Sequence, residues 1–461
     1  MKSSFYDSDS HPTPQRGPKT LILGLGKTGL SCARFLRRLG VPVAVTDTRS
    51  HPPALSVARE EMPDLPLFLG GFDAAAFAVA QRLVISPGLA LSEPLVAEAL
   101  ARGVEVVGDI ELFARTVAAP VAAITGSNGK STVTTLLGEM ALASGLRTAV
   151  GGNLGEPALD LLDPSVQLYV LELSSFQLET TRSLVTRVAT VLNISEDHMD
   201  RYPSLEAYAA TKASLLDGAE VAVLNRDDPR VTAMSGKAAR DIWFSLAPPQ
   251  REEDFGLLKL AEMTWLARGS QPFMPVTELA LPGLHNQLNA LAALAMGEAC
   301  GFPLAPRLQV LRSFRGLAHR TMLVADLQGV RWYDDSKGTN PGAAIAALNG
   351  LIDPNGAARA VLIAGGDGKG ADFTQLAETL VSRARAVILI GRDGPLIERA
   401  LAGRVVTAKA RDMDEAVKLA AAAALPGDLV LLSPACASFD MFDNYEHRGR
   451  VFTAAVRGLG R

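Results

Sequence analysis

Residues 124–132, with the sequence ITGSNGKST, have the composition of a loop that binds nucleotide phosphates. They end the apolar run 121–125, which we expect to be a strand, and they open an Ala- and Leu-rich stretch typical of a helix. In such a loop the backbone N–H groups surround phosphate oxygens, the Lys130 ammonium neutralises the β- and γ-phosphates, and the hydroxyl of Ser131 or Thr132 ligates Mg²⁺. The usual pattern has glycine where this chain has Ile124, so its first glycine is shifted to Gly126. The segment predicts an ATP site; the alternative is an accidental match.

Two further glycine-rich turns follow predicted strands. Residues 24–29 fit the pattern G-x-G-x-x-G, and Asp47 ends the next predicted strand, where an acid that binds a ribose belongs. This turn predicts a nucleotide or dinucleotide site, with a turn that holds no ligand as the alternative. Residues 365–370 contain Lys369, which either binds an anionic substrate or decorates the surface.

Several charged residues are candidates for completing the chemistry of an ATP site. Glu172 ends the predicted strand 168–173, and a carboxylate buried there is expected to meet a cation or hydrogen-bond donors. His198 lies in an acidic segment and is either a metal ligand or a solvated loop residue. Lys212 lies on a predicted amphipathic helix, 205–216, where the residues alone favour a solvated position. Residues 334–337 (DDSK) form either a metal or amine site or a simple turn.

The elements that must position these residues follow an α/β pattern. Short apolar runs alternate with Ala- and Leu-rich amphipathic segments, which predicts parallel, doubly wound sheets covered by helices on both faces. The pattern restarts at each glycine-rich turn, and 461 residues suit three domains. We predict a Rossmann-like N-terminal domain (18–108), a central P-loop-type ATPase domain with a mostly parallel sheet (109–313) and a Rossmann-like C-terminal domain (314–461). The predicted strands are 20–25, 41–46, 83–86, 121–125, 168–173, 188–193, 221–225, 330–333, 360–364, 386–390 and 429–433, with loops and short strands over 245–282.

Composition excludes several classes of protein. The chain is 48% hydrophobic and 20% charged with a net charge of −4, which excludes a disordered chain and any bulk electrostatic basis for binding nucleic acid. Three widely spaced cysteines indicate a reduced compartment. Residues 1–17 are predicted to be a disordered tail without the apolar core of a signal peptide, and no apolar run is long enough to span a membrane. We therefore predict a cytoplasmic protein with small-molecule substrates.

Eight segments, taken in order, resemble the Mur ligases from about residue 20 to the C-terminus. They are ITGSNGKST, LELSSFQLE (171–179), NISEDHMDRY (193–202), GLHNQLNALAAL (283–294), HR (319–320), DDSKGTN (334–340), GGDGK (365–369) and SPACASFDMF (433–442). The resemblance implies an ATP-dependent carbon–nitrogen ligase of peptidoglycan precursor synthesis. ATP would phosphorylate the carboxylate of UDP-N-acetylmuramoyl-L-alanine, and the amine of D-glutamate would attack the acyl phosphate.

The resemblance also implies roles for individual residues. The catalytic residues would be Lys130, Glu172, His198 and Lys212, and the Mg²⁺ ligands, for two ions, Ser131, Glu172, His198 and a carbamylated Lys212. ATP would bind Gly126, Ser127, Asn128, Gly129, Lys130, Ser131, Thr132, Asn286, Asn289, Arg320 and Asp335. The uridine diphosphate and its sugar would bind Lys27, Thr28, Asp47, Thr48, Arg49, Gly88 and Asn153. The amino acid would bind Lys337, Thr339, Lys369, Ser438 and Tyr445, the last at a position where this family usually has Phe.

Other functions remain open at this stage. A sister ligase that adds another amino acid, or a ligase of the folylpolyglutamate type, would share most of these segments. A nicotinamide-dependent oxidoreductase would use the turn at 24–29 but leave the ATP loop idle, and a non-catalytic nucleotide-binding module would leave the polar clusters unexplained. The chain is expected to act as a monomer.

Overall fold

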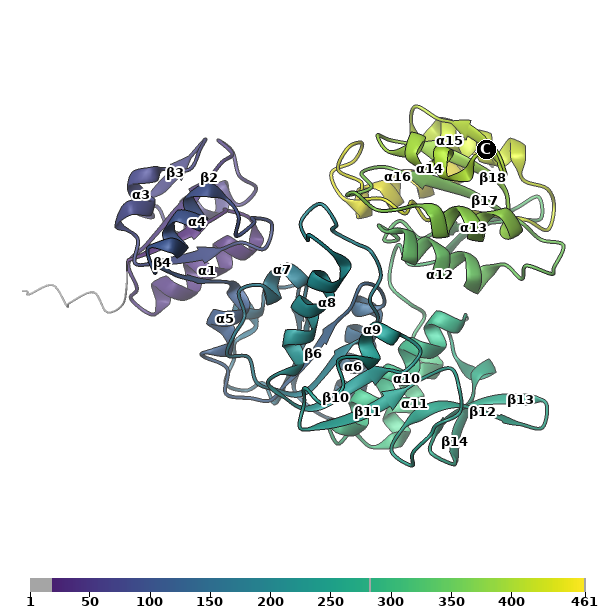
Figure 1. Ribbon diagram of the computed structural model, residues 1–461, viewed down its shortest axis with the longest axis horizontal. Helices are drawn as coiled ribbons and strands as arrows, with labels where there is room; N and C mark the ends of the chain where they lie inside the picture. Colours follow the sequence, from purple (N-terminus) through teal and green to yellow (C-terminus); the bar gives the residue numbers. More distant parts are fainter. Residues whose placement is uncertain (1–18, 282, 460–461) are drawn as a thin grey trace, which may run out of the picture. The chain divides into compact units, whose positions relative to one another are not determined.

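The computed structural model describes residues 19–281 and 283–459. They form three β-sheets whose strands alternate along the chain with helices (Figure 1). The tail predicted over residues 1–17 lies outside the described residues. Each sheet contains one of the three glycine-rich turns directly after a strand, so the predicted α/β class and its threefold restart are confirmed.

The first sheet is parallel throughout, in the order β3-β2-β1-β4-β5. Its elements are β1 (Thr20–Leu23), α1 (Lys27–Arg38), β2 (Val43–Asp47), α2 (Leu55–Glu61), β3 (Leu67–Leu69), α3 (Ala74–Val79), β4 (Arg82–Ile85), α4 (Pro94–Ala101), β5 (Glu105–Val107) and α5 (Asp109–Ala114). All four residues of β1 are buried, as expected for a central strand covered on both faces. Order and direction match the predicted Rossmann-like domain.

The second sheet has nine strands in the order β14-β13-β12-β11-β10-β9-β6-β8-β7. Strands β12, β13 and β14 pair antiparallel at one edge, which confirms the short strands predicted over 245–282, and the pairs of β6 with β8 and β9 are parallel. Its elements are β6 (Val121–Thr125), α6 (Lys130–Ala143), β7 (Thr148–Gly152), η1 (Ala158–Leu161), β8 (Leu168–Glu172), α7 (Ser175–Leu178), β9 (Thr186–Val191), α8 (Leu205–Ala213), η2 (Ser214–Leu216), β10 (Ala219–Asn225), α9 (Pro229–Thr232), β11 (Arg240–Phe244), β12 (Phe255–Leu260), β13 (Met263–Arg268), β14 (Gln271–Pro275), η3 (Val276–Glu278), α10 (Leu284–Ala299) and α11 (Leu304–Ser313).

The third sheet has the order β15-β16-β20-β17-β18-β19, with only β15 antiparallel to its neighbour. Its elements are β15 (Met322–Leu327), β16 (Val330–Asp334), α12 (Pro341–Leu351), β17 (Ala360–Gly365), α13 (Thr374–Arg383), β18 (Ala384–Ile390), α14 (Gly394–Leu401), β19 (Val406–Lys409), α15 (Met413–Ala423), β20 (Leu429–Leu432) and α16 (Tyr445–Gly458). Apolar clusters lie on both of its faces, one around α12 and α13 and one around α15 and α16. This arrangement is the predicted doubly wound one.

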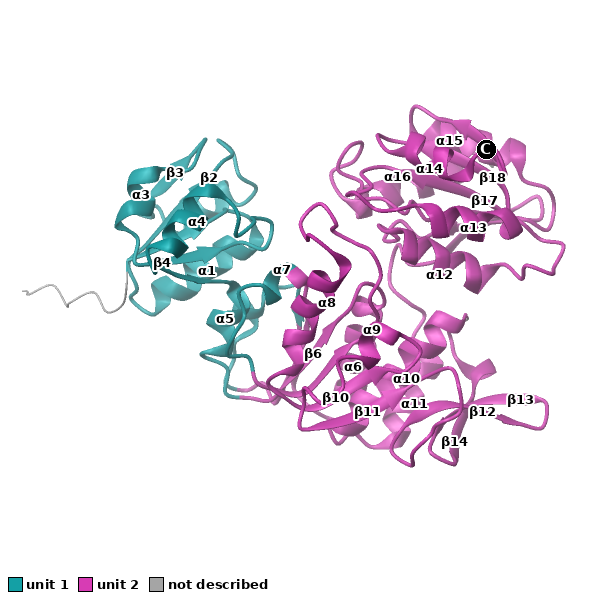
Figure 2. Cartoon of the chain, in the orientation of Figure 1, with its two compact units in different colours: residues 1–118, 151–164, 176–184 teal, residues 119–150, 165–175, 185–461 magenta. Residues whose placement is uncertain are grey.

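The chain forms two compact units (Figure 2). Of the described residues, unit 1 comprises 19–118, 151–164 and 176–184, and unit 2 comprises the others. The returning segment 176–184 is held in unit 1 by polar contacts with Glu111. The carboxylate of Glu111 accepts hydrogen bonds from the backbone N–H groups of Arg182 (2.7 Å) and Ser183 (3.0 Å). The domain limits at 108 and 313 stay predictions. No helix in the part of the chain that the structure describes is long and apolar enough to cross a membrane.

The turn at 24–29 yields a stability prediction, because α1 packs closely against it. A Cβ on Gly29 would lie 1.9 Å from the backbone oxygen of Gly24, whereas a Cβ on Gly26 would meet nothing within 4 Å. We expect Gly29→Ala to lower the free energy of unfolding by about 2 kcal/mol or more through overpacking. Gly26→Ala, at an ordinary φ of −93°, is the matched control and should unfold near the wild-type temperature. Thermal unfolding measures both, and equal stabilities of the two variants would contradict the packing argument.

Candidate active site

Unit 1 contains a pocket of about 450 Å³ at the carboxyl ends of β1, β2 and β4. All seven residues expected to hold the uridine diphosphate and its sugar line it: Lys27, Thr28, Asp47, Thr48, Arg49, Gly88 and Asn153. Lys27 opens α1, so the free N–H groups of that helix N-terminus lie at the pocket and favour an anion.

Asp47 is occupied by contacts with its own loop. Its carboxylate accepts the backbone N–H of Leu25 (2.7 Å), the backbone N–H of Arg49 (2.9 Å) and two guanidinium N–H groups of Arg49. Burial by itself would raise the pKa of Asp47, but the hydrogen bonds from Arg49 and Leu25 outweigh it and lower this pKa. The ionised carboxylate therefore fixes the glycine turn and Arg49, and its predicted contact with a ribose stays a prediction.

Gln177 lines the same pocket and was missed from the sequence. Its amide Nε2 donates to the buried carboxylate of Asp109 (3.0 Å). Burial raises the pKa of Asp109 to about 6. The segment LELSSFQLE contains Gln177, but its place at this pocket could not be predicted, because the chain returns to unit 1 only after β8.

In unit 2 the phosphate loop connects β6 to α6 as predicted. Gly126 has a φ of +144° and Gly129, which precedes the helix, a φ of +83°, so both adopt backbone conformations that favour glycine. Asn193, which follows β9, brackets the loop: its Oδ1 accepts the backbone N–H of Asn128 (2.8 Å) and its Nδ2 donates to the Asn128 carbonyl (3.0 Å). The sequence analysis did not single out Asn193, although its place after a buried strand was a usable signal.

Lys130 is folded back onto the loop. Its ammonium donates to the carbonyl oxygens of Gly126 (2.8 Å) and Ser127 (2.9 Å). Burial lowers the pKa of Lys130, while the nearby carboxylates of Glu172 and Asp197 oppose that change. The ammonium is thus placed at the mouth of the loop, where the phosphates of a nucleotide would lie.

Lys212 is buried, with only 1% of its surface exposed, so the solvated position that the residues alone favoured is wrong. Its Nζ lies 3.4 Å from the Thr125 hydroxyl and 4.6 Å from the centre of the Tyr208 ring. Burial and the neighbouring Lys130 lower the pKa of Lys212 far below its usual range. Both effects favour the neutral amine of Lys212 over its ammonium form.

Glu172 and His198 both lie near these lysines. Glu172 ends β8 and is 2% exposed, and its charge acts on both Lys130 and Lys212. His198 has a left-handed φ of 60°, and burial lowers its pKa to about 4, so its imidazole is neutral at pH 7. Within residues 19–281 and 283–459, no three side chains of His, Cys, Asp or Glu are placed to hold a metal ion. The predicted ligand set contains only two residues of these types, so this finding does not bear on it.

A second pocket of about 450 Å³ adjoins the phosphate loop. Among its lining residues are seven of the eleven predicted to bind ATP, namely Asn128, Gly129, Thr132, Asn286, Asn289, Arg320 and Asp335. The Arg320 guanidinium donates to the Ser131 hydroxyl (2.9 Å), which brings the segment before β15 to the start of α6. Burial raises the pKa of Asp335 to about 6, although Ser433 and Thr321 donate hydrogen bonds to it.

The residues predicted to bind the amino acid follow the carboxyl ends of β16, β17 and β20, which are neighbours in the third sheet. Backbone hydrogen bonds join the three loops: the N–H of Ala435 donates to Gly338 (2.9 Å), and Asp367 and Ala437 exchange two bonds. Lys337 lies with its ammonium 3.9 Å from the centre of the Tyr445 ring, and burial lowers the pKa of Lys337 to about 8. Thr339 and Ser438 lie in these loops, and Lys369 follows β17.

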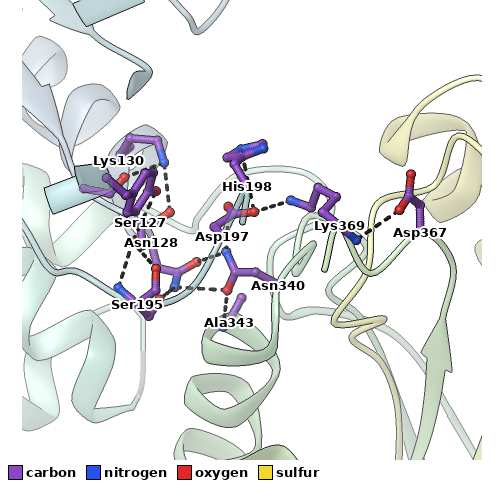
Figure 3. A network of polar contacts seen from close by, with 12 residues as sticks. Ser127, Asn128, Lys130, Ser195, Asp197, His198, Asn340, Ala343, Asp367 and Lys369 are labelled. Carbon is purple, nitrogen blue, oxygen red and sulfur yellow. Dashed lines mark hydrogen bonds and ion pairs between the residues drawn. The ribbon is translucent and has the colours of Figure 1, made fainter. Parts of the chain in front are cut away.

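One network within unit 2 links these loops to the phosphate loop (Figure 3). Asp197 receives the Lys369 ammonium on Oδ1 and the Asn340 side-chain amide on Oδ2 (3.1 Å). Asn340 and Asn128 exchange two hydrogen bonds of 3.2 and 3.3 Å. The sequence analysis assigned no role to Asp197 or Asn340, because the partners of Asp197 lie more than 140 positions further along the chain.

Comparisons with known proteins agree with this arrangement. Residues 18–108 match the N-terminal domain of MurD-like Mur ligases, residues 124–297 the Mur ligase middle domain and residues 319–436 the Mur ligase glutamate ligase domain. The chain is 53% identical over 447 residues to the UDP-N-acetylmuramoylalanine–D-glutamate ligase of Nitrosococcus oceani, covering 97% of this chain and 98% of the relative. It is 52% identical to the enzyme of the same name from Methylococcus capsulatus, over 96% of this chain and 95% of the relative.

Solved structures show the same fold at lower identity. The UDP-N-acetylmuramate–alanine ligase of Thermotoga maritima superposes with a TM-score of 0.62 at 18% identity, over 96% of this chain and 100% of that one. The pseudomurein peptide ligase type C of Methanothermus fervidus gives a TM-score of 0.59 at 19% identity, over 90% of this chain and 96% of that one. The predicted three-domain organisation is confirmed.

The buried Lys212 amine predicts a gain in stability on its removal. The unfolded chain carries a protonated lysine below its ordinary pKa of 10.5, whereas the folded protein must bury that charge or release the proton. Folding is therefore penalised at neutral pH, and the penalty fades as pH rises towards 10.5. We expect Lys212→Met, in buffer free of carbon dioxide, to raise the free energy of unfolding at pH 7 by about 1–3 kcal/mol. Denaturant unfolding at pH 7 and pH 10 measures it, and a gain that does not shrink at pH 10 would contradict the electrostatic cause.

Proposed function

We propose that this chain, which belongs to the Mur ligase family, joins D-glutamate to UDP-N-acetylmuramoyl-L-alanine in the synthesis of peptidoglycan precursors. The observation that carries this proposal is 51–53% identity over 95–97% of the chain to several relatives named UDP-N-acetylmuramoylalanine–D-glutamate ligase. The alternatives of a nicotinamide-dependent oxidoreductase and a non-catalytic module do not fit this family membership. A sister ligase with another amino acid is separated by the assay described below.

The pocket of unit 1 supports binding of the nucleotide half of the first substrate. It offers the N-terminus of α1 and the cations Lys27 and Arg49 to an anion. The glycine turn at 24–29 would then hold a uridine diphosphate, which shares with a dinucleotide the need for phosphate at a helix N-terminus.

The phosphate loop and its surroundings support a reaction that uses ATP. Lys130, Arg320 and the N-terminus of α6 would stabilise negative charge on the transferring phosphoryl group, and their contacts around the loop support this role. The substrate carboxylate attacks this phosphoryl group and ADP leaves, so that an acyl phosphate forms. The amine of D-glutamate then attacks the acyl carbon, and phosphate leaves with the bonding electrons as the amide forms.

Mg²⁺ would supply further neutralisation of the charge on the phosphate oxygens. Ser131, Glu172, His198 and Lys212 are the residues that would hold it, and two ions are proposed. The Ser131 hydroxyl and the buried Glu172 carboxylate supply the oxygen ligands that Mg²⁺ prefers, and His198 would add an imidazole nitrogen that is neutral at pH 7.

Carbamylation would complete this set at Lys212. A neutral amine reacts with carbon dioxide to give a carbamate and a proton, and the low pKa of buried Lys212 favours the neutral form. Carbamylation would convert an amine without charge into an anionic oxygen ligand near Lys130.

The C-terminal loops support binding of a dicarboxylate amino acid. Lys337 and Lys369 supply two cations, and Thr339 and Ser438 supply hydroxyl groups. Tyr445 offers its ring face to Lys337, which a Phe would also do, so the substitution retains this contact. The predictions of a cytoplasmic location and a monomer stay open.

The proposed function is tested by release of phosphate in the presence of ATP, Mg²⁺ and UDP-N-acetylmuramoyl-L-alanine. We expect release to require D-glutamate, and release driven by L-lysine or diaminopimelate instead would assign a sister ligase. Lys130→Ala should reduce turnover by at least about a hundredfold, because no other group replaces its charge at the loop. A wild-type rate in that variant would show that the loop is not catalytic.

The carbamate at Lys212 has its own test. Lys212→Ala should be nearly inactive and should regain activity with acetate or propionate, whose carboxylates can replace the carbamate. Chloride at the same ionic strength is the control for a salt effect. Full activity of Lys212→Ala without any added carboxylate would contradict the proposal.

A further inference from the structure

Asp197 lies where the two ligand-binding regions of unit 2 meet, yet the reaction as described gives it no role. Its side chain is 9% exposed, and its two carboxylate oxygens face different groups: Oδ1 faces Lys369 and lies 3.6 Å from the Nε2 of His198, and Oδ2 faces Asn340. One oxygen receives the Lys369 ammonium and the other the side-chain amide of Asn340 (Figure 3). We propose that Asp197 is a positioning residue that holds the Lys369 ammonium in place for a carboxylate of the amino-acid substrate, an inference that rests on the proposed function.

The backbone of Lys369 is fixed independently of its ammonium. Lys369 has a left-handed φ of 52°, and its backbone N–H donates to the Asp367 carboxylate (3.0 Å). The preceding N–H, of Gly368, donates to Asp393 (2.7 Å). The loop therefore directs the side chain, but several rotatable bonds separate this backbone from the ammonium. A second anchor is needed at the far end, and Asp197 provides it.

The other carboxylate oxygen of Asp197, Oδ2, connects Asp197 to the proposed nucleotide site. Asn340 donates to it at 3.1 Å, and the same amide group donates to Asn128 of the phosphate loop at 3.2 Å. Asn340 is itself held as the N-cap of α12, because its Oδ1 accepts the backbone N–H of Ala343 (2.9 Å). The position of the Lys369 ammonium is thus set by contacts that also reach the loop expected to hold the phosphates.

The ion pair leaves Lys369 able to bind a ligand. An ammonium has three N–H donors, and Asp197 takes one of them, so two remain for a substrate carboxylate. The Lys369 side chain is 12% exposed, so it is nearly immobilised before any ligand arrives. Ordering a free lysine on binding costs side-chain entropy, and Asp197 removes most of that cost in advance.

The test compares Asp197→Asn with Glu196→Gln. Both variants remove one carboxylate from the same segment, but the Glu196 carboxylate accepts from the backbone of Asp372 (3.2 Å) and does not contact Lys369. In Asp197→Asn we expect the KM for D-glutamate to rise about tenfold or more, because an ammonium loses its charged partner. The KM for ATP should change by less than about threefold. Glu196→Gln should keep the wild-type values.

A readout that does not depend on activity follows the Lys369 amine directly. Trace labelling with acetic anhydride, quantified for each lysine by mass spectrometry, should show Lys369 reacting several-fold faster in Asp197→Asn than in the wild type. Its rate should be unchanged in Glu196→Gln, with Lys27 as an internal reference. Adding Asp197→Asn to Lys369→Ala should not raise the KM for D-glutamate further. Should Asp197→Asn not fold, Asp197→Glu keeps the charge and is expected to give an intermediate labelling rate.

The outcomes separate the positioning role of Asp197 from the proposed function. Unchanged labelling of Lys369 in folded Asp197→Asn, or equal KM changes for D-glutamate and ATP, would overturn the positioning role. Faster labelling in a protein whose wild type releases no phosphate with D-glutamate would instead overturn the proposed function, while the contact between Asp197 and Lys369 would stand.

Discussion

The burial of several basic side chains is the constraint around which unit 2 is built. Lys130, Lys212, Lys337 and Arg320 lie around the phosphate loop of a protein whose net charge is −4. Burial lowers the pKa of each of the three lysines, which shows that the fold bears an electrostatic cost there. Ligands that carry phosphates and carboxylates would relieve that cost, so the same feature that penalises folding favours binding of anionic substrates.

The topology explains why so many charged groups meet. In parallel sheets the carboxyl ends of the strands share one edge, and the loops that follow them collect there. The central sheet contributes the loops after β6, β8 and β9, and the third sheet contributes those after β16, β17 and β20. Unit 1 repeats the arrangement with a pocket of its own, where the loop after β1 carries the glycine turn.

Local sequence predicted the strands and turns well, because a buried parallel strand is an uninterrupted apolar run. Strand β6 has the predicted limits, and β1 ends two residues earlier than predicted. Lys212 shows where such reasoning fails. Helix periodicity places it one turn after Tyr208 on the same face of α8, but it does not reveal that this face is buried near Thr125 of β6. Asp197 and Gln177 were missed for a related reason, since their partners are brought together only by the tertiary fold.

The link between the two ligand-binding regions is made of amides, and this choice has an electrostatic consequence. Asn128 and Asn340 exchange hydrogen bonds as neutral groups, so they relate the phosphate loop to α12 without adding charge to a site already rich in cations. A carboxylate at either position would compete with the phosphates for Lys130, and a lysine would deepen the cost of burial. The charged member of this network is Asp197, and its carboxylate is paired with the Lys369 ammonium. Hydrogen bonds between neutral amides thus hold the phosphate loop and α12 in a fixed relation, while the charged side chains remain available to bind the ligands.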